Sequence, residues 1–129
     1  MASTGQTALI PSGPDGSHLF FLILGPAQLV GYGSTPQIIL VSLCSVHDGV
    51  PYDPACVLEA GDHPFIQRKS YIAYRHMRVD SEAHVDAMLE KGVWQSHVDC
   101  TPSVMQQIIG NVCASKLAPR EFKRLFGCS

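Results

Sequence analysis

Four apolar runs of strand length stand in the first eighty residues of the chain. His18–Leu24 (HLFFLIL) is continuously apolar between glycines, and Gln37–Val46 (QIILVSLCSV) is rich in β-branched residues, so each predicts a buried strand. Cys56–Glu59 predicts a short third strand, and Gln28–Tyr32 is a candidate edge strand. In the fourth run, Ser70–Val79, neither alternate face is purely apolar, which predicts that one side borders solvent or a groove.

After this strand the apolar spacing changes to that of helices. Ser81 is a good N-cap and Gly92 a good stop signal, so they predict a helix between them. Thr101 followed by Pro102 predicts the start of a second helix, and Pro119 opens a last turn or short helix. Strands followed by helices indicate an α+β fold. The Gly/Pro turns favour a small, strongly bent antiparallel β-barrel followed by two or three C-terminal helices.

The predicted domain organisation is simple. Residues 1–17 are expected to form a flexible lead, because prolines and glycines interrupt them, and residues 18–129 to form one α+β domain. Within it, the barrel is expected over 18–80 and a helical extension over 81–129. No apolar run approaches the ~20 residues that span a bilayer. No signal peptide is visible, so we expect a cytoplasmic protein that does not enter the membrane.

Five cysteines are spread widely along the chain and include no CxxC pair. An odd number without close pairs predicts reduced thiols, several of them buried, and no disulfide framework. Because zinc sites normally contain a close ligand pair, we expect no metal site and no cofactor.

The net charge of −2 conceals a strongly dipolar chain. Residues 1–67 contain five acidic and no basic side chains, whereas the remainder contains nine basic and six acidic ones. The first basic residue, Arg68, lies where the sign changes. Such a distribution steers charged partners, so the segment around Arg68 is the first place to look for a site.

One histidine stands at a turn between two strands. His63 lies between Asp62 and Pro64, and histidine exchanges protons near neutral pH, so it is a candidate general acid or base. The alternative is that Asp62 and His63 only cap the turn.

A row of basic and aromatic side chains follows. Cations contact phosphates and aromatic rings stack on unpaired bases, so this row predicts a nucleic-acid surface. Its alternative is a solvated strand face whose arginines pair with nearby carboxylates. The row consists of Arg68, Lys69, Tyr71, Tyr74, Arg75, His76 and Arg78.

The order of these strands, with the segments VLEAGDHPFI and SYIAYR, resembles the PemK/MazF-like toxins of toxin–antitoxin systems over roughly His18–Val79. The resemblance implies an SH3-like barrel, a homodimer, an antitoxin or other protein partner, and cleavage of single-stranded RNA without a metal. On this hypothesis His63 carries the proton and Arg75 stabilises the developing charge. The RNA-binding residues would then be Arg68, Lys69, Tyr71, Tyr74 and Arg78.

Two hypotheses from other classes stay open. Typical members of that family carry a basic residue in the loop after the first strand, and residues 25–36 contain none. This departure favours a non-catalytic protein-binding module, such as an accessory or inhibitor protein of a phage or mobile element that binds a host protein. The third possibility is a purely structural homodimer.

Overall fold

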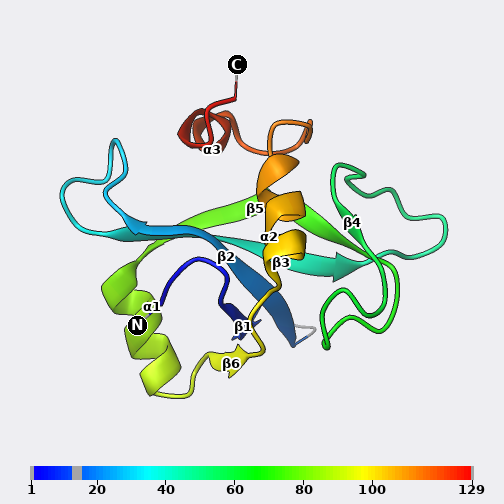
Figure 1. Cartoon of the computed structure of the whole chain (residues 1–129), viewed down its shortest axis with the longest axis horizontal. Coiled ribbons are helices and arrows are strands. Elements are labelled where there is room, and N and C mark those ends of the chain that lie inside the picture. Colours follow the sequence, from blue (N-terminus) through cyan, green and yellow to red (C-terminus); the bar gives the residue numbers. More distant parts are fainter. Residues whose placement is uncertain (1, 13–15, 129) are drawn as a thin grey trace.

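A computed structural model describes residues 2–12 and 16–128 of the protein. These residues form one curled antiparallel sheet with the strand order β4-β5-β3-β2-β1-β6, together with three short helices (Figure 1). The predicted α+β class with a strongly bent antiparallel sheet is therefore confirmed. The elements are β1 Thr7–Pro11, β2 Ser17–Ala27, β3 Gln37–Ser45, β4 Val57–Leu58, β5 Ser70–Ser81, α1 Glu82–Glu90, β6 Gln95–His97, α2 Pro102–Gly110 and α3 Arg120–Leu125.

The four main predicted strands are β2, β3, β4 and β5. Consecutive side chains of β2 enter two separate hydrophobic clusters, because neighbouring residues of a strand point to opposite faces. Leu19 and Phe21 pack with α2 on one face, while Phe20 and Leu22 pack with α1 on the other. The continuous apolar run of β2 thus reflects burial on both faces of the sheet.

Two strands lie outside the predicted barrel. β1 falls in the segment expected to be a flexible lead, and it pairs with β2 on one side and β6 on the other. β6 lies within the expected helical extension, so strands and helices are not cleanly separated along the chain. Gln28–Tyr32 is a loop and not a strand.

The predicted helix starts are confirmed. The Ser81 hydroxyl accepts a hydrogen bond from the His84 N–H at 3.1 Å, and the Thr101 hydroxyl accepts one from the Val104 N–H at 3.3 Å. These bonds satisfy backbone donors that have no partner within the helix. Trp94, 5% exposed, packs the end of α1 against the sheet.

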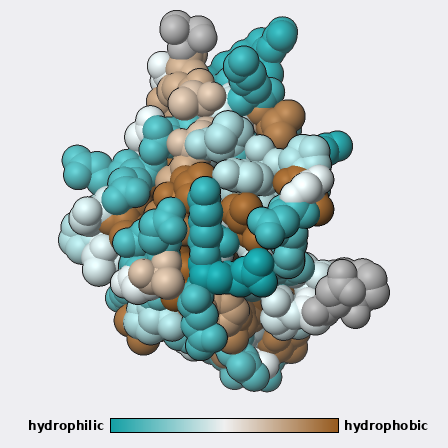
Figure 2. Space-filling view, turned by 90° about the vertical axis from the view of Figure 1, so that its right-hand side faces the viewer, coloured by the Kyte–Doolittle hydropathy of each residue, from teal (hydrophilic) through white to brown (hydrophobic). Residues whose placement is uncertain are grey.

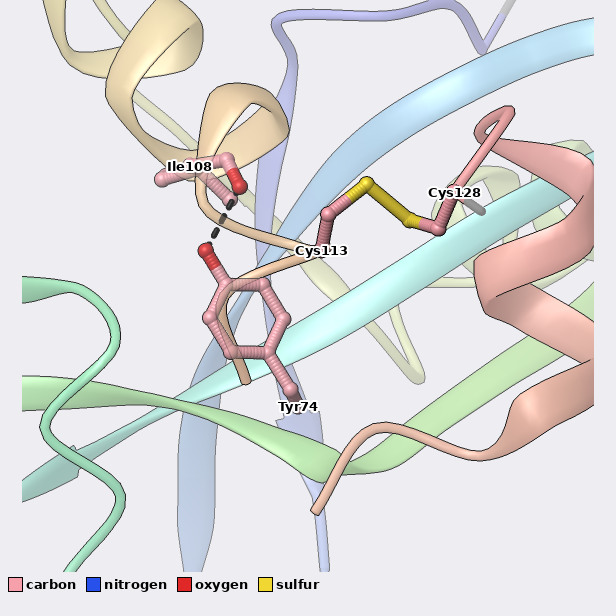
Figure 3. The surroundings of a disulfide bond; sticks show 4 residues. All are labelled: Tyr74, Ile108, Cys113 and Cys128. Atoms are coloured by element: carbon pink, nitrogen blue, oxygen red, sulfur yellow. Dashed lines mark hydrogen bonds between the residues drawn. A yellow bond between two sulfur atoms is a disulfide. The ribbon is translucent and has the colours of Figure 1, made fainter. Parts of the chain in front are cut away.

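The expectation of no disulfide is wrong. Cys113 and Cys128 are bonded, with their Cα atoms 5.4 Å apart, and the bond ties the end of α3 to the segment after α2 (Figure 3). Beside it the Tyr74 hydroxyl donates to the Ile108 carbonyl oxygen at 2.6 Å and fixes α2 to β5. The other three cysteines are free.

No helix of the described segments has the length and apolarity that a membrane crossing requires.

Candidate functional site

A groove of about 790 Å³ opens at one end of the sheet, where β2 begins, β3 ends and β5 begins. We call it the end groove. Figure 2 views the molecule from the side on which the β3 arrow ends in Figure 1, and there hydrophobic surface lies between hydrophilic side chains. Fifteen of the described residues line the groove: Ser17, His18, Leu19, Leu43, Cys44, Ser45, His47, Pro64, Phe65, Ile66, Gln67, Arg68, Ser70, Tyr71 and His97.

The described lining of the end groove has one sign of charge. It contains Arg68 and three of the six histidines of the chain, and none of the ten acidic residues that the structure describes. One guanidinium nitrogen of Arg68 donates to the Val46 carbonyl oxygen at 3.0 Å, which holds the cation beside the end of β3. The groove is therefore suited to an anionic ligand.

The three histidines come from distant parts of the chain. His18 begins β2 and its Nδ1 lies 2.7 Å from the Ser12 hydroxyl. His97 ends β6, and its Nδ1 accepts the Val98 N–H at 2.9 Å, so its Nε2 is left to donate. His47 is exposed just after β3. No local motif joins them, which is why sequence reasoning did not select them; only the strand pairing brings them to one groove.

His63 lies behind the groove and is 2% exposed. Its Nδ1 accepts the Phe65 N–H at 3.1 Å, so its Nε2 carries the proton that is donated to the Val98 carbonyl oxygen at 2.6 Å. The Asp62 carboxylate accepts the Glu59 N–H at 2.8 Å. Both residues thus cap the turn, as the alternative interpretation of the sequence holds, and both ring nitrogens of His63 are engaged.

His63 positions the part of the groove next to it. Its ring centroid lies 5.2 Å from that of His97, whose ring is in turn 5.7 Å from Phe65. The Ile66 N–H donates to the His63 carbonyl oxygen at 2.8 Å. The buried imidazole therefore supports the loop that presents Phe65 to the groove.

Of the residues predicted to bind RNA, the structure brings Arg68 and Tyr71 into the end groove. The Tyr71 ring is half-buried, with its centroid 5.4 Å from that of Tyr52. Burial, together with the Cys44 thiol beside it, raises the pKa of the Tyr71 hydroxyl. Lys69 is exposed next to Arg68 but does not line the groove.

The other predicted residues lie elsewhere. Tyr74 is 0% exposed and its hydroxyl is bonded to α2, so the stacking role predicted for it is wrong. Arg78 lies between the rings of Phe20 and Trp94, at 5.9 and 5.5 Å from their centroids, and pairs with Asp80 at 3.0 Å.

Arg75 is exposed at an irregularity of β5. Ala73 of β5 pairs with Ser42 of β3, and Arg78 with Leu40, so four β5 residues lie opposite one residue of β3. Arg75 and the adjacent His76 project from this bulge into solvent, as the mixed pattern of the strand predicts. The structure does not bring Arg75 and His63 into one groove.

The free thiols are not poised for nucleophilic chemistry. Burial raises the pKa of Cys44, which lines the end groove, and that of Cys56. Burial, with a smaller effect of Asp99, raises the pKa of Cys100 to about 11. A thiol attacks as its thiolate, so all three are predominantly unreactive at neutral pH.

Over residues 2–12 and 16–128, no three His, Cys, Asp or Glu side chains are grouped in a way that could hold a metal ion. In comparisons with known proteins, no family model matches the chain. No curated protein matches it either.

Proposed function

We propose that this protein is a divergent relative of the PemK/MazF-like barrels and that it binds single-stranded RNA in the end groove. The observation that carries the proposal is the charge of the lining over the described residues: one arginine, three histidines and no carboxylate. RNA carries a negative charge at every phosphate, and a cleft lined by one sign of charge concentrates the opposite sign. The basic composition of the lining contrasts with the whole chain, in which acidic residues outnumber lysines and arginines by eleven to nine.

Two aromatic rings in the groove give the bases a surface. Phe65 is 38% exposed on the loop supported by His63, and Tyr71 is half-buried at the start of β5. Unpaired bases stack on such rings without regard to sequence, each contributing about 1–3 kcal/mol. A base on Phe65 or Tyr71 would leave its phosphate near Arg68, which lines the same groove.

The groove also contains the groups that RNA transphosphorylation uses. In that reaction the 2′-hydroxyl oxygen bonds to phosphorus, the bond to the 5′-oxygen breaks, one base takes the 2′ proton and one acid protonates the leaving oxygen. Histidine serves both roles, and a cation stabilises the phosphorane. His47 and His97 with Arg68 are the residues we propose for these steps, in place of His63 and Arg75.

The test is the anisotropy of a labelled, mixed-sequence single-stranded RNA titrated in EDTA, with Arg68→Gln and Tyr71→Ala variants. Each lost phosphate contact weakens binding about eightfold at 50 mM salt, because the salt slope falls by about 0.7 per contact. Lys91→Gln, an exposed residue at the end of α1, is the control that removes the same charge elsewhere.

We expect Arg68→Gln to weaken binding and reduce the salt slope, and Lys91→Gln to leave binding within about twofold. Gel analysis of the same mixtures tests cleavage, which His97→Ala should abolish while RNA stays bound. Absence of salt-dependent RNA binding by the wild type would sink the proposal and leave the protein-binding module as the interpretation of the fold.

A further inference from the structure

A second cationic surface lies at the C-terminal end of the described chain, away from the end groove. Lys116, Arg120, Lys123 and Arg124 line a depression of about 520 Å³, together with Ala118 and Cys128. We call it the α3 cradle. It shares no residue with the end groove. These four residues are nearly half of the nine lysines and arginines of the chain.

The cradle is a basic segment on an acidic body. Residues 114–127, enclosed by the disulfide, contain four basic side chains and one acidic one, or +3. The whole chain carries −2, so everything outside this segment sums to −5. Within the described ranges, the ion pairs shorter than 4.0 Å all involve Asp80, so no carboxylate there neutralises the cradle.

Three attachments hold these like charges together. At the start of the segment, the Ser115 hydroxyl donates to the buried Asp53 carboxylate at 2.5 Å and accepts the N–H groups of Leu117 and Ala118. In the middle, Phe122 of α3 is buried in the main hydrophobic cluster. At the end, Cys128 is bonded to Cys113 (Figure 3). The charges are therefore presented on a fixed backbone.

The side chains of the cradle fit phosphate better than a protein surface. Arg120 and Arg124 are four residues apart on α3 and so lie on one face, and guanidinium groups bind phosphate oxygens in pairs. Apart from the cations, Ala118 and Cys128 are the described residues that line the depression, and they form no aromatic or large apolar pocket that could anchor a protein partner.

We propose that the α3 cradle binds the phosphodiester backbone of nucleic acid, as a second contact separate from the end groove. The choice of nucleic acid among phosphate ligands rests on the proposed function, whereas the inference that the cradle binds phosphate rests on its side chains alone. A strand with bases in the groove and backbone on the cradle would be held at two places. A duplex, whose paired bases cannot stack in the groove, would be held by the cradle alone.

The experiment uses the oxidised full chain and two labelled probes, a single-stranded RNA and a 12-base-pair DNA duplex. At 50 mM salt the affinity for the duplex should fall about fifteenfold in Arg120→Gln and by a similar factor in Arg124→Gln, because each lost phosphate contact lowers the salt slope on B-DNA by about 0.9. Arg68→Gln and the charge-matched Lys91→Gln should leave duplex binding within about twofold. Both cradle arginines are exposed, so these variants keep the fold.

Duplex binding that is absent, or equal in the cradle variants and Lys91→Gln, overturns the inference. Complete displacement of the duplex by 1 mM inorganic pyrophosphate at matched ionic strength also overturns it, because the cradle would then be a site for small phosphates. RNA binding that depends on Arg68, with duplex binding indifferent to Arg124, leaves the end groove standing and refutes the cradle. Duplex binding that depends on Arg124, with RNA binding indifferent to Arg68, does the reverse.

Discussion

Replacement of the buried His63 separates a structural role from a catalytic one. His63→Ala removes the bond to the Val98 carbonyl and the bond from the Phe65 N–H, each worth about 1 kcal/mol. It also removes the edge-to-face contact with Phe21, whose ring centroid is 6.1 Å away. Such a contact contributes about 0.5–1.5 kcal/mol. The expected loss is about 3 kcal/mol, which lowers the melting temperature of a domain of this size by about 10 °C.

Thermal unfolding followed by circular dichroism measures this loss. His47→Ala is the control, because His47 is also a groove histidine but is exposed, and its loss should change stability by less than about 0.5 kcal/mol. His63→Gln, which can still donate towards Val98, should fall between the two. A His63→Ala protein that melts within about 3 °C of wild type would refute the anchoring role derived from the two hydrogen bonds.

Three further outcomes follow from the contacts of the core. The double variant Cys113→Ser/Cys128→Ser should lose about 3 kcal/mol of unfolding free energy, since the disulfide closes a loop of 15 residues. The unfolded wild type should show three titratable thiols without reductant and five with it. Tyr74→Phe should lose about 1–3 kcal/mol in urea unfolding, because the Ile108 carbonyl keeps no donor in its place. Because the pKa of Cys100 is raised in the folded protein, the contribution of this thiol to stability is complete below its ordinary pKa of 9 and is lost as the pH rises to about 11. The urea midpoints of the wild type and of Cys100→Ala should therefore converge over that pH interval.

Much of the fold could be predicted because its signals are local. The apolar run of β2 is buried on both faces, and a run of that kind needs no knowledge of its neighbours. Ser81 and Thr101 cap helices through side chains that lie next to the backbone groups they satisfy.

The two missed strands are short. β1 contains five residues and buries Ala8 and Ile10, but its apolar run is only three residues long and ends at Pro11, which is below the length that predicts a strand. β6 contains three residues, all polar, and is held by backbone hydrogen bonds to the distant β1, which leave no trace in the side-chain pattern. The disulfide was missed for a similar reason, because Cys128 meets Cys113 only once α3 has folded back. Disulfides are characteristic of oxidising compartments. The cytoplasmic location therefore stays a prediction, and the number of titratable thiols in the unfolded protein bears on it.

The site was predicted in part. Arg68 and Tyr71 stand next to the change of charge and do reach the end groove. The depth of His63 could not be inferred from its neighbours in the sequence, since the carbonyl that accepts its proton belongs to Val98, 35 residues away. SH3-like identity, homodimerisation and an antitoxin partner remain predictions of the resemblance.

The central claim is the location of RNA in the end groove, and photo-crosslinking tests it most directly. A single-stranded RNA containing 4-thiouridine, irradiated with the protein and digested, identifies the contacting peptides by mass spectrometry. We predict crosslinks to the segments that contain Phe65 and Tyr71, lost on addition of excess unlabelled RNA. Crosslinks confined to Arg75–Arg78, or no crosslink above the level given by an unrelated acidic protein, would contradict the account.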